Sequence, residues 1–190
     1  MSDAASRGYS PPDRIRGATF RGVLAFQHPC NGDRAQVFSL ILYQPEIPPN
    51  TGNIIRLCAN VGAQLHLVHP LGFTLDEPRV RRAGLDYHEL ACVTEHSSLS
   101  SCLEQIGATR VYALSTKGTR SVFDPRYAAG DAFVLGPETR GLPEAVLAEF
   151  DADSVLRIPM RAGNRSLNLS NAAAVVLYEA WRQAALAGGV

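Results

Sequence analysis

Polar side chains crowd a short loop that leads into the most apolar helix predicted for this chain, near its C-terminus. A helix start needs one capping residue, and Ser170 or Asn171 can supply it by accepting a backbone N–H. The other polar groups exceed that need, and hydrogen-bonding groups at a helix N-terminus are suited to holding a ligand. The loop is therefore the first candidate binding site. Its polar residues are Asn164, Arg165, Ser166, Asn168, Ser170 and Asn171.

A second loop, residues 48–56 with the sequence PPNTGNIIR, combines a helix start with an arginine. Asn50 can cap the helix, and Gly52 lets a partner approach the backbone closely. The helix N-terminus offers N–H groups to an anion, and Arg56 adds a guanidinium fork suited to phosphate. Helical periodicity does not place Asn50 and Arg56 on one face. Spacing alone leaves open the alternative of a capped helix with a surface arginine.

The third loop, residues 135–143 with the sequence LGPETRGLP, is predicted to be stiff because it contains two glycines and two prolines. It has neither the Gly-Lys-Ser/Thr end of a P-loop nor the G-x-G-x-x-G pattern of a dinucleotide site. Both of those common nucleotide cradles are therefore excluded at this loop. Glu138 is a candidate functional carboxylate, and the alternative is that it only complements the dipole of the next helix.

Alternating strands and helices must position these loops. The pattern predicts an α/β fold with a mostly parallel sheet flanked by helices. Residues 1–36 are expected to form a flexible extension, and residues 37–190 a single domain. Ligands of open α/β sheets lie beyond the carboxyl ends of the strands, so the loops are expected to form one composite pocket. The expected strands are 37–43, 64–68, 88–93, 110–114, 132–135 and 156–158, and the expected helices are 51–61, 74 or 76 to 82, 98–106, 143–150 and 170–187.

Charge is balanced along the chain, with 18 basic and 18 acidic residues. A net charge of zero argues against a general nucleic-acid-binding protein but leaves room for a local basic site. The candidates for phosphate contact are a small cluster, Arg79, Arg81 and Arg82, with Arg161 and Arg165 as further candidates. A solvated charged surface is the alternative.

The cysteines and histidines show no metal-ligand spacing, so no metal site is expected. The scattered cysteines are interpreted as reduced thiols, two or three of them in the core, as in a cytoplasmic protein. No membrane-spanning run or secretory signal is evident. The residues concerned are Cys30, Cys58, Cys92, Cys102, His66, His69, His88 and His96.

Taken together, the loops resemble the three motifs of the SPOUT (SpoU-TrmD) class of RNA methyltransferases. The similarity is greatest with the TrmL/YibK type, the tRNA wobble-nucleotide 2′-O-methyltransferases. It extends over about residues 37–183, while residues 1–36 have no counterpart. Residues 43–56 resemble the first motif, 136–143 the second, and 158–160 with 166–172 the third; residues 81–88 and 178–183 also resemble this branch.

This resemblance implies S-adenosylmethionine as the methyl donor, held in a cleft built by a C-terminal deep trefoil knot (the SPOUT fold). It also implies a homodimer with the final helix in the interface, which suits a helix that is apolar on more than one side. By position, the residues implied to line the donor pocket are Leu114, Gly136, Ile158, Met160, Ser166 and Leu167.

The same resemblance assigns roles in transfer to a ribose 2′-oxygen. Arg56 resembles the catalytic arginine, but a guanidinium does not readily lose a proton, so we expect it to grip a substrate phosphate that takes the proton. The remaining residues of the implied catalytic set would orient Arg56 and the ribose, with Tyr178 contributing from the dimer interface. That set is Asn50, Glu138, Ser166, Asn168 and Tyr178.

The implied substrate is the anticodon stem-loop of tRNA, methylated at the wobble nucleotide, cytidine or uridine 34. The implied RNA contacts are Arg56, Arg79, Arg81, Arg82 and Arg165. Two alternatives remain open from the sequence: 2′-O-methylation of another RNA such as ribosomal RNA, and a catalytically silent RNA-binding module on the same fold.

Overall fold

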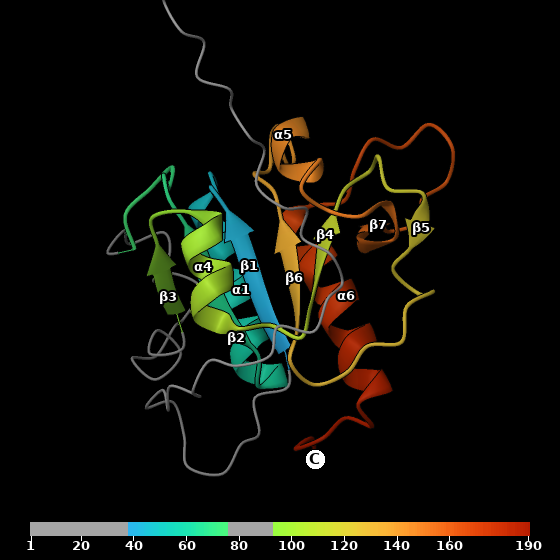
Figure 1. The fold of residues 1–190 in the computed structure, drawn as a ribbon. Helices are drawn as coiled ribbons and strands as arrows, with labels where there is room; N and C mark the ends of the chain where they lie inside the picture. Colours follow the sequence, from blue (N-terminus) through green and yellow to red (C-terminus); the bar gives the residue numbers. More distant parts are fainter. Residues whose placement is uncertain (1–37, 76–92) are drawn as a thin grey trace, which may run out of the picture.

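The computed structural model describes residues 38–75 and 93–190 of the chain, and they form an α/β fold around one sheet (Figure 1). The sheet has seven strands in the order β3-β2-β1-β6-β4-β7-β5, and every pairing in it is parallel. The prediction of a parallel α/β sheet is confirmed. The strands are β1 (Phe38–Tyr43), β2 (Gln64–Val68), β3 (Val93–His96), β4 (Arg110–Leu114), β5 (Arg120–Ser121), β6 (Asp131–Leu135) and β7 (Val155–Arg157).

Helices cover both faces of the sheet (Figure 1). One face carries α1 and α6, which pack against each other, and the other carries α4. The helices are α1 (Pro48–Val61), α4 (Leu99–Ile106), α5 (Glu144–Leu147) and α6 (Leu169–Gln183), with a 3-10 turn at Ala152–Ser154. None of the helices in the described ranges is long and apolar enough to cross a membrane.

The central strands are apolar because both of their faces are covered. Leu40 of β1 is fully buried and pairs with Phe133 of β6. Phe133 in turn contacts the rings of Tyr112 and Tyr127, with centroids 5.9 and 5.1 Å away. This core fixes the carboxyl ends of β1, β4 and β6, where the candidate loops begin.

The end of α1 and the start of α4 lie within one residue of their predicted positions. Gly62 ends α1 in the left-handed conformation, with φ of 72°. Ser98 caps α4 by accepting a hydrogen bond from the backbone N–H of Ser101, in a capping box. Both boundaries are local, which is why the sequence alone predicted them.

Several elements differ from prediction. Helix α1 begins three residues earlier, at Pro48, and α6 ends at Gln183 instead of residue 187. The helix predicted at 143–150 ends at Leu147, because Glu149 and Phe150 close i→i+3 turns that carry Phe150 into the core. Strand β7 lies one residue earlier than predicted. The two-residue strand β5 was not predicted; it carries no apolar run and exists because it pairs with β7.

Several expectations fall outside the described residues. These are the extension at 1–36, the short helix ending at residue 82, and Arg79, Arg81 and Arg82 of the basic cluster. The strand predicted at 88–93 overlaps the described chain only at Val93, and β3 continues beyond its predicted end to His96.

Candidate functional site

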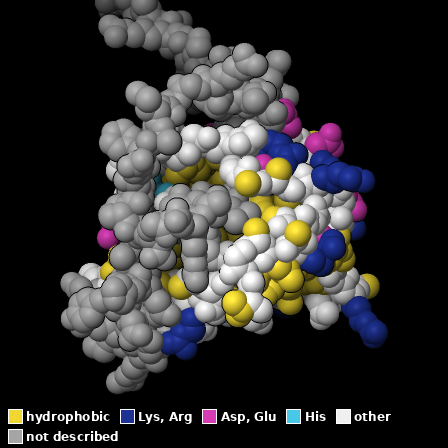
Figure 2. All heavy atoms as spheres, turned by 90° about the horizontal axis from the view of Figure 1, so that it is seen from below, with side chains coloured by type: hydrophobic (Ala, Val, Ile, Leu, Met, Phe, Trp, Pro, Cys, Tyr) yellow, Lys and Arg dark blue, Asp and Glu magenta, His cyan; other side chains and the backbone are white. Residues whose placement is uncertain are grey.

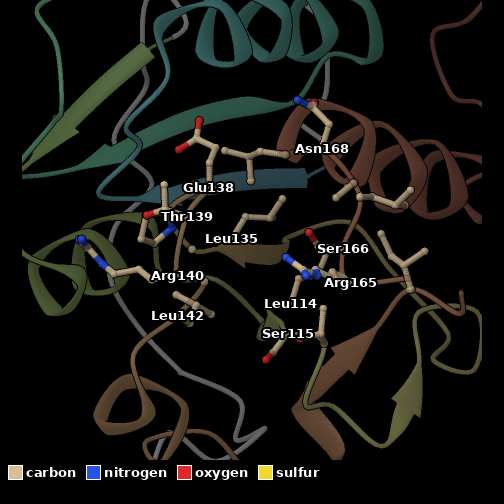
Figure 3. A pocket seen from close by; sticks show the side chains of 18 of the residues that line it. Leu114, Ser115, Leu135, Glu138, Thr139, Arg140, Leu142, Arg165, Ser166 and Asn168 are labelled. Carbon is tan, nitrogen blue, oxygen red and sulfur yellow. The ribbon is translucent and has the colours of Figure 1, made fainter. Parts of the chain in front are cut away.

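A cavity of about 510 Å³ lies beyond the carboxyl ends of β4, β6 and β7, where the composite pocket was predicted (Figure 3). Each of these strands ends in residues that line it: Leu114 of β4, Leu135 of β6, and Ile158 after β7. The start of α1 contributes Ile47 and Asn50. Segments far apart in the sequence therefore converge, because parallel strands deliver their carboxyl ends to one edge.

All six residues predicted to hold the methyl donor line this cavity. They are Leu114, Gly136, Ile158, Met160, Ser166 and Leu167. Their mixture of apolar side chains and open backbone groups is typical of a pocket for a small organic ligand. Their contact with a donor stays a prediction.

Gly136 is the tightest point of the wall. A Cβ atom at this position would overlap the backbone nitrogen of Leu142 and the carbonyl carbon of Gly141. Only glycine therefore allows the loop after β6 to fold back on itself, which brings residues 137–142 to the cavity.

A chain of side-chain hydrogen bonds joins the three candidate loops. Glu138 Oε1 accepts from Nδ2 of Asn50 at 3.1 Å, and Asn50 Oδ1 accepts from Nδ2 of Asn168 at 2.9 Å. Asn50 is buried, with 6% of its surface exposed. Because a carboxylate only accepts, Glu138 fixes the direction of the whole chain, and the three predicted polar residues form one unit.

The capping predictions at two helix starts were wrong. Ile47, and not Asn50, is the N-cap of α1, and no side chain caps that helix. The side-chain amide of Asn50 is instead hydrogen-bonded to Glu138 and Asn168.

The cap of α6 is likewise neither Ser170 nor Asn171. Asn168 Oδ1 accepts from the backbone N–H groups of both, at 2.9 and 3.4 Å. Asn168, a predicted catalytic residue, is thus also the residue that starts the last helix.

Two predicted catalytic residues lie outside the cavity lining. Arg56 is exposed on α1, two turns beyond Asn50, as their spacing indicated. Tyr178 is 47% exposed on α6, where its ring contacts Trp181. Within one chain, neither residue is part of the donor pocket.

Basic side chains stand at the cavity. Arg165 lines it beside Ser166, and Lys117 and Arg140 belong to the same wall (Figure 3). Lys117 pairs with the exposed carboxylate of Glu144 at 2.7 Å, and this contact lowers the pKa of Glu144. Arg140 likewise pairs with Glu46, so Arg165 is the candidate at this wall for contact with an anionic group of the substrate.

Sequence reasoning missed part of the lining. Residues 115–117 follow β4 directly, so the rule that ligands lie beyond strand ends was a signal for them. Thr139 and Arg140 stood inside the third loop but were given no role. The described lining residues Glu138, Asn50 and Asn168 offer fixed hydrogen-bonding groups, which suit orientation and electrostatic stabilisation of a bound group.

A separate buried cluster joins β2, β3 and α4. His66 Nδ1 lies 3.0 Å from His96 Nε2. The Sγ of Cys102 lies within 4.8 Å of one ring nitrogen of each histidine. One imidazole donating to the other accounts for the short contact. Burial lowers the pKa of His96 and raises that of the Cys102 thiol to about 12. Sequence spacing did not predict this group, because three separate elements supply it.

Comparison with known proteins gives one consistent result. The SpoU rRNA Methylase family matches residues 37–178. A tRNA (cytidine(34)-2'-O)-methyltransferase from Methylovorus glucosotrophus is 55% identical over 154 residues, which cover 81% of this chain and all of that protein.

Solved structures agree. One described as "Structural insights into the 2-OH methylation of C/U34 on tRNA" has a TM-score of 0.72 and 47% identity, covering 79% of this chain and 92% of its own. The SpoU methyltransferase AviRb from Streptomyces viridochromogenes, in complex with AdoMet, has a TM-score of 0.69 and 25% identity, covering 84% of this chain and 61% of its own.

Proposed function

The chain belongs to the SpoU rRNA methylase family, and from that membership we propose that it transfers a methyl group from S-adenosylmethionine to the ribose 2′-oxygen of the wobble nucleotide of tRNA, cytidine or uridine 34. Relatives above 50% identity carry the name of this activity. The observation that carries the proposal is the hydrogen-bonded chain Glu138–Asn50–Asn168 at the wall of the cavity.

The cavity fits the donor in size and lining. Its volume of about 510 Å³ lies inside the range of roughly 300–1,000 Å³ usual for small-molecule sites. Backbone groups around Gly136 and the residues after β7 would hold the donor, with Leu114, Ile158 and Leu167 as apolar contacts. When bound, S-adenosylmethionine supplies an electrophilic methyl group with a neutral leaving group.

On the substrate side, the chain's own residues would align the ribose. Asn50 and Asn168 are held in fixed orientations by Glu138 and by the first N–H groups of α6. Ser166 lies beside them at the same cavity. Such preorganised groups raise the rate by placing the attacking oxygen in line with the methyl group.

Arg56 would act on the RNA backbone. Its exposed position on α1, outside the donor cavity, suits a contact with substrate phosphate. The phosphate held there would accept the proton of the 2′-hydroxyl, since the guanidinium cannot. Arg165, at the cavity wall, is proposed as a second phosphate contact, and Arg79, Arg81 and Arg82 stay predictions.

We also propose a homodimer built on α6. Tyr178 on α6 is 47% exposed within one chain, and its ring contacts that of Trp181 on the same helix. Seen from below, the part of the surface that the described residues form also exposes hydrophobic side chains, with Lys and Arg at its margin (Figure 2). An exposed apolar surface of this kind is typical of a protein interface. A second copy would bring its Tyr178 toward this chain's site.

The deep trefoil knot is part of the same proposal. Strand β7 lies between β4 and β5, although it comes after both in the sequence. Ser115 and Val122 donate hydrogen bonds to Leu156 and Arg157, so the segment between β4 and β6 wraps around β7. A crystal structure traced through residues 110–190 would test whether the chain closes a true crossing.

The activity is tested by incubating the purified chain with S-adenosylmethionine carrying a labelled methyl group and either bulk tRNA or ribosomal RNA. We expect label on tRNA, mapped to the ribose of nucleotide 34. Label only on ribosomal RNA would favour the alternative substrate. Donor binding without transfer to any RNA would favour the silent module. Cytoplasmic localisation is proposed because tRNA is the substrate, and it suits the buried free thiols of Cys58 and Cys102.

A further inference from the structure

The loop before α1 and the loop after β6 each contribute a carboxylate that accepts hydrogen bonds from the other loop. Glu138 accepts from the backbone N–H groups of Glu46 and Ile47, at 2.8 and 3.2 Å. In return, the Glu46 carboxylate accepts from the hydroxyl of Thr139 at 2.6 Å and from its backbone N–H at 3.3 Å. Each loop therefore supplies the acceptor that the other lacks.

Arg140 forms an ion pair with the Glu46 carboxylate. Its Nη1 lies 3.0 Å from Oε1 of Glu46, and its Nη2 donates to Oε1 of Gln44 at 3.0 Å. The Glu46 side chain is 25% exposed and that of Arg140 is 56% exposed. Through Arg140, the Glu46 carboxylate is therefore linked to Gln44 of its own loop as well as to Thr139.

The loop needs this support because it is exposed. Thr139, Arg140 and Gly141 all lie at the surface. Its base is fixed by the close approach of Gly136 to Leu142 and by the hydrogen bond from Gly141 N to the Pro137 carbonyl. The Glu46 side chain restrains the exposed part of this loop at Thr139, the residue after Glu138.

We propose that Glu46 is a positioning residue for the methyl transfer: it holds Thr139 and Arg140, and thereby fixes Glu138 and the Asn50–Asn168 pair that Glu138 orients. Glu46 does not line the cavity, so it acts through its neighbours. The inference rests on the proposed function for its rate effect, but its structural part stands by itself. A displacement of about 1 Å in a catalytic arrangement costs on the order of 100-fold in rate.

The test compares Glu46→Ala with Glu104→Ala, which removes an exposed carboxylate from α4 on the other face of the sheet. Single-turnover methyl transfer is measured beside the donor Kd and the thermal unfolding midpoint. We expect Glu46→Ala to slow transfer about 10- to 100-fold with the donor Kd within about threefold, and Glu104→Ala to leave both unchanged. A methyl-transfer rate of Glu46→Ala within about twofold of the parent rate would overturn the proposal.

Thr139→Val separates positioning from a general loss of stability, because it keeps the shape of the side chain and removes the hydroxyl donor. If Glu46 acts through Thr139, the double variant is no slower than Glu46→Ala alone; additive effects would contradict the proposal.

If the parent chain methylates no RNA, the proposed function fails separately. The side-chain amide NMR signal of Asn50 still decides the positioning role, since it should shift in Glu46→Ala and stay in place in Glu104→Ala. An unchanged signal in both would again overturn it.

Discussion

Asn168 shows how one side chain serves both folding and function. Its Oδ1 accepts the first N–H groups of α6, and its Nδ2 donates to Asn50. The helix therefore fixes the amide that reaches the candidate site. Ser170 and Asn171 were predicted as caps, but their backbone N–H groups donate to Asn168 instead.

Replacing Asn168 separates the two tasks. Asn168→Asp keeps an acceptor for the α6 N–H groups but removes the donor to Asn50. We expect the cap of α6 to be kept and methyl transfer to be slower by at least about tenfold, because Asn50 loses its donor. Asn168→Ala should lose the same rate and also about 1 kcal/mol of stability, because the cap is gone. Unfolding curves and single-turnover rates check both; a parental rate in Asn168→Asp would contradict the relay.

At the scale of elements, the site depends on how the loop after β6 turns back. Gly136 permits a backbone approach that no other residue allows, and Pro137 and Gly141 close the turn. The loop that was predicted to be stiff, because it contains two glycines and two prolines, therefore forms one wall of the cavity.

Gly136→Ala should abolish donor binding, because its Cβ would overlap the Leu142 backbone. The matched control is Gly62→Ala at the end of α1, where φ is 72° but no atom lies within 4 Å of the added Cβ. Both changes are expected to lower stability, the control by about 1–2 kcal/mol through backbone strain alone. Calorimetric titration with S-adenosylmethionine, below the unfolding temperature of both variants, should show loss of binding for Gly136→Ala only. Equal donor affinities would disprove the tight-wall interpretation.

The His66–His96 contact makes the packing of β2, β3 and α4 sensitive to pH. Burial lowers the folded-state pKa of His96 below its ordinary value of 6.5. The unfolded chain then binds a proton that the folded chain resists. The associated stability is fully present above pH 6.5 and is lost as pH falls below it, through the folded pKa.

Denaturant unfolding at pH 7.5 and 5.0 should therefore show a loss of stability that is smaller in His96→Gln. His69→Gln is the control, since His69 lies at the surface and pairs with Glu95. The same pH-dependent loss in the parent and in His96→Gln would exclude His96 as its source.

At the scale of the whole molecule, α6 has one face in the core and another at the surface. Ala173, Val176, Leu177 and Ala180 are fully buried, whereas Tyr178 is 47% exposed. A helix that is apolar on both sides needs a second partner, which supports the proposed dimer.

Tyr178→Lys should convert the dimer to a monomer and stop methyl transfer while preserving the fold, because the side chain is exposed within one chain. Gln105→Lys, an exposed change on α4, should leave the dimer intact. Sedimentation velocity measures the association state and circular dichroism the fold. A parent chain that sediments as a monomer, or a Tyr178→Lys chain that stays dimeric, would refute this interface.

The sequence by itself determined the central strands, the C-terminal end of α1, the extent of α4, and the place of the cavity. These depend on local patterns: apolar runs such as Phe38–Tyr43, a glycine stop at Gly62, and loops that follow parallel strands. The six donor contacts, which the family resemblance implied, all line this cavity.

Only the tertiary structure decided how polar side chains pair. Asn50 lies 88 residues from Glu138 and 118 from Asn168, so no local signal shows that its amide joins them instead of capping α1. The same holds for β5, which exists through β7, and for His66 beside His96. A capping motif describes a residue's nearest neighbours in the chain, whereas a hydrogen bond goes to the partner that folding places within reach.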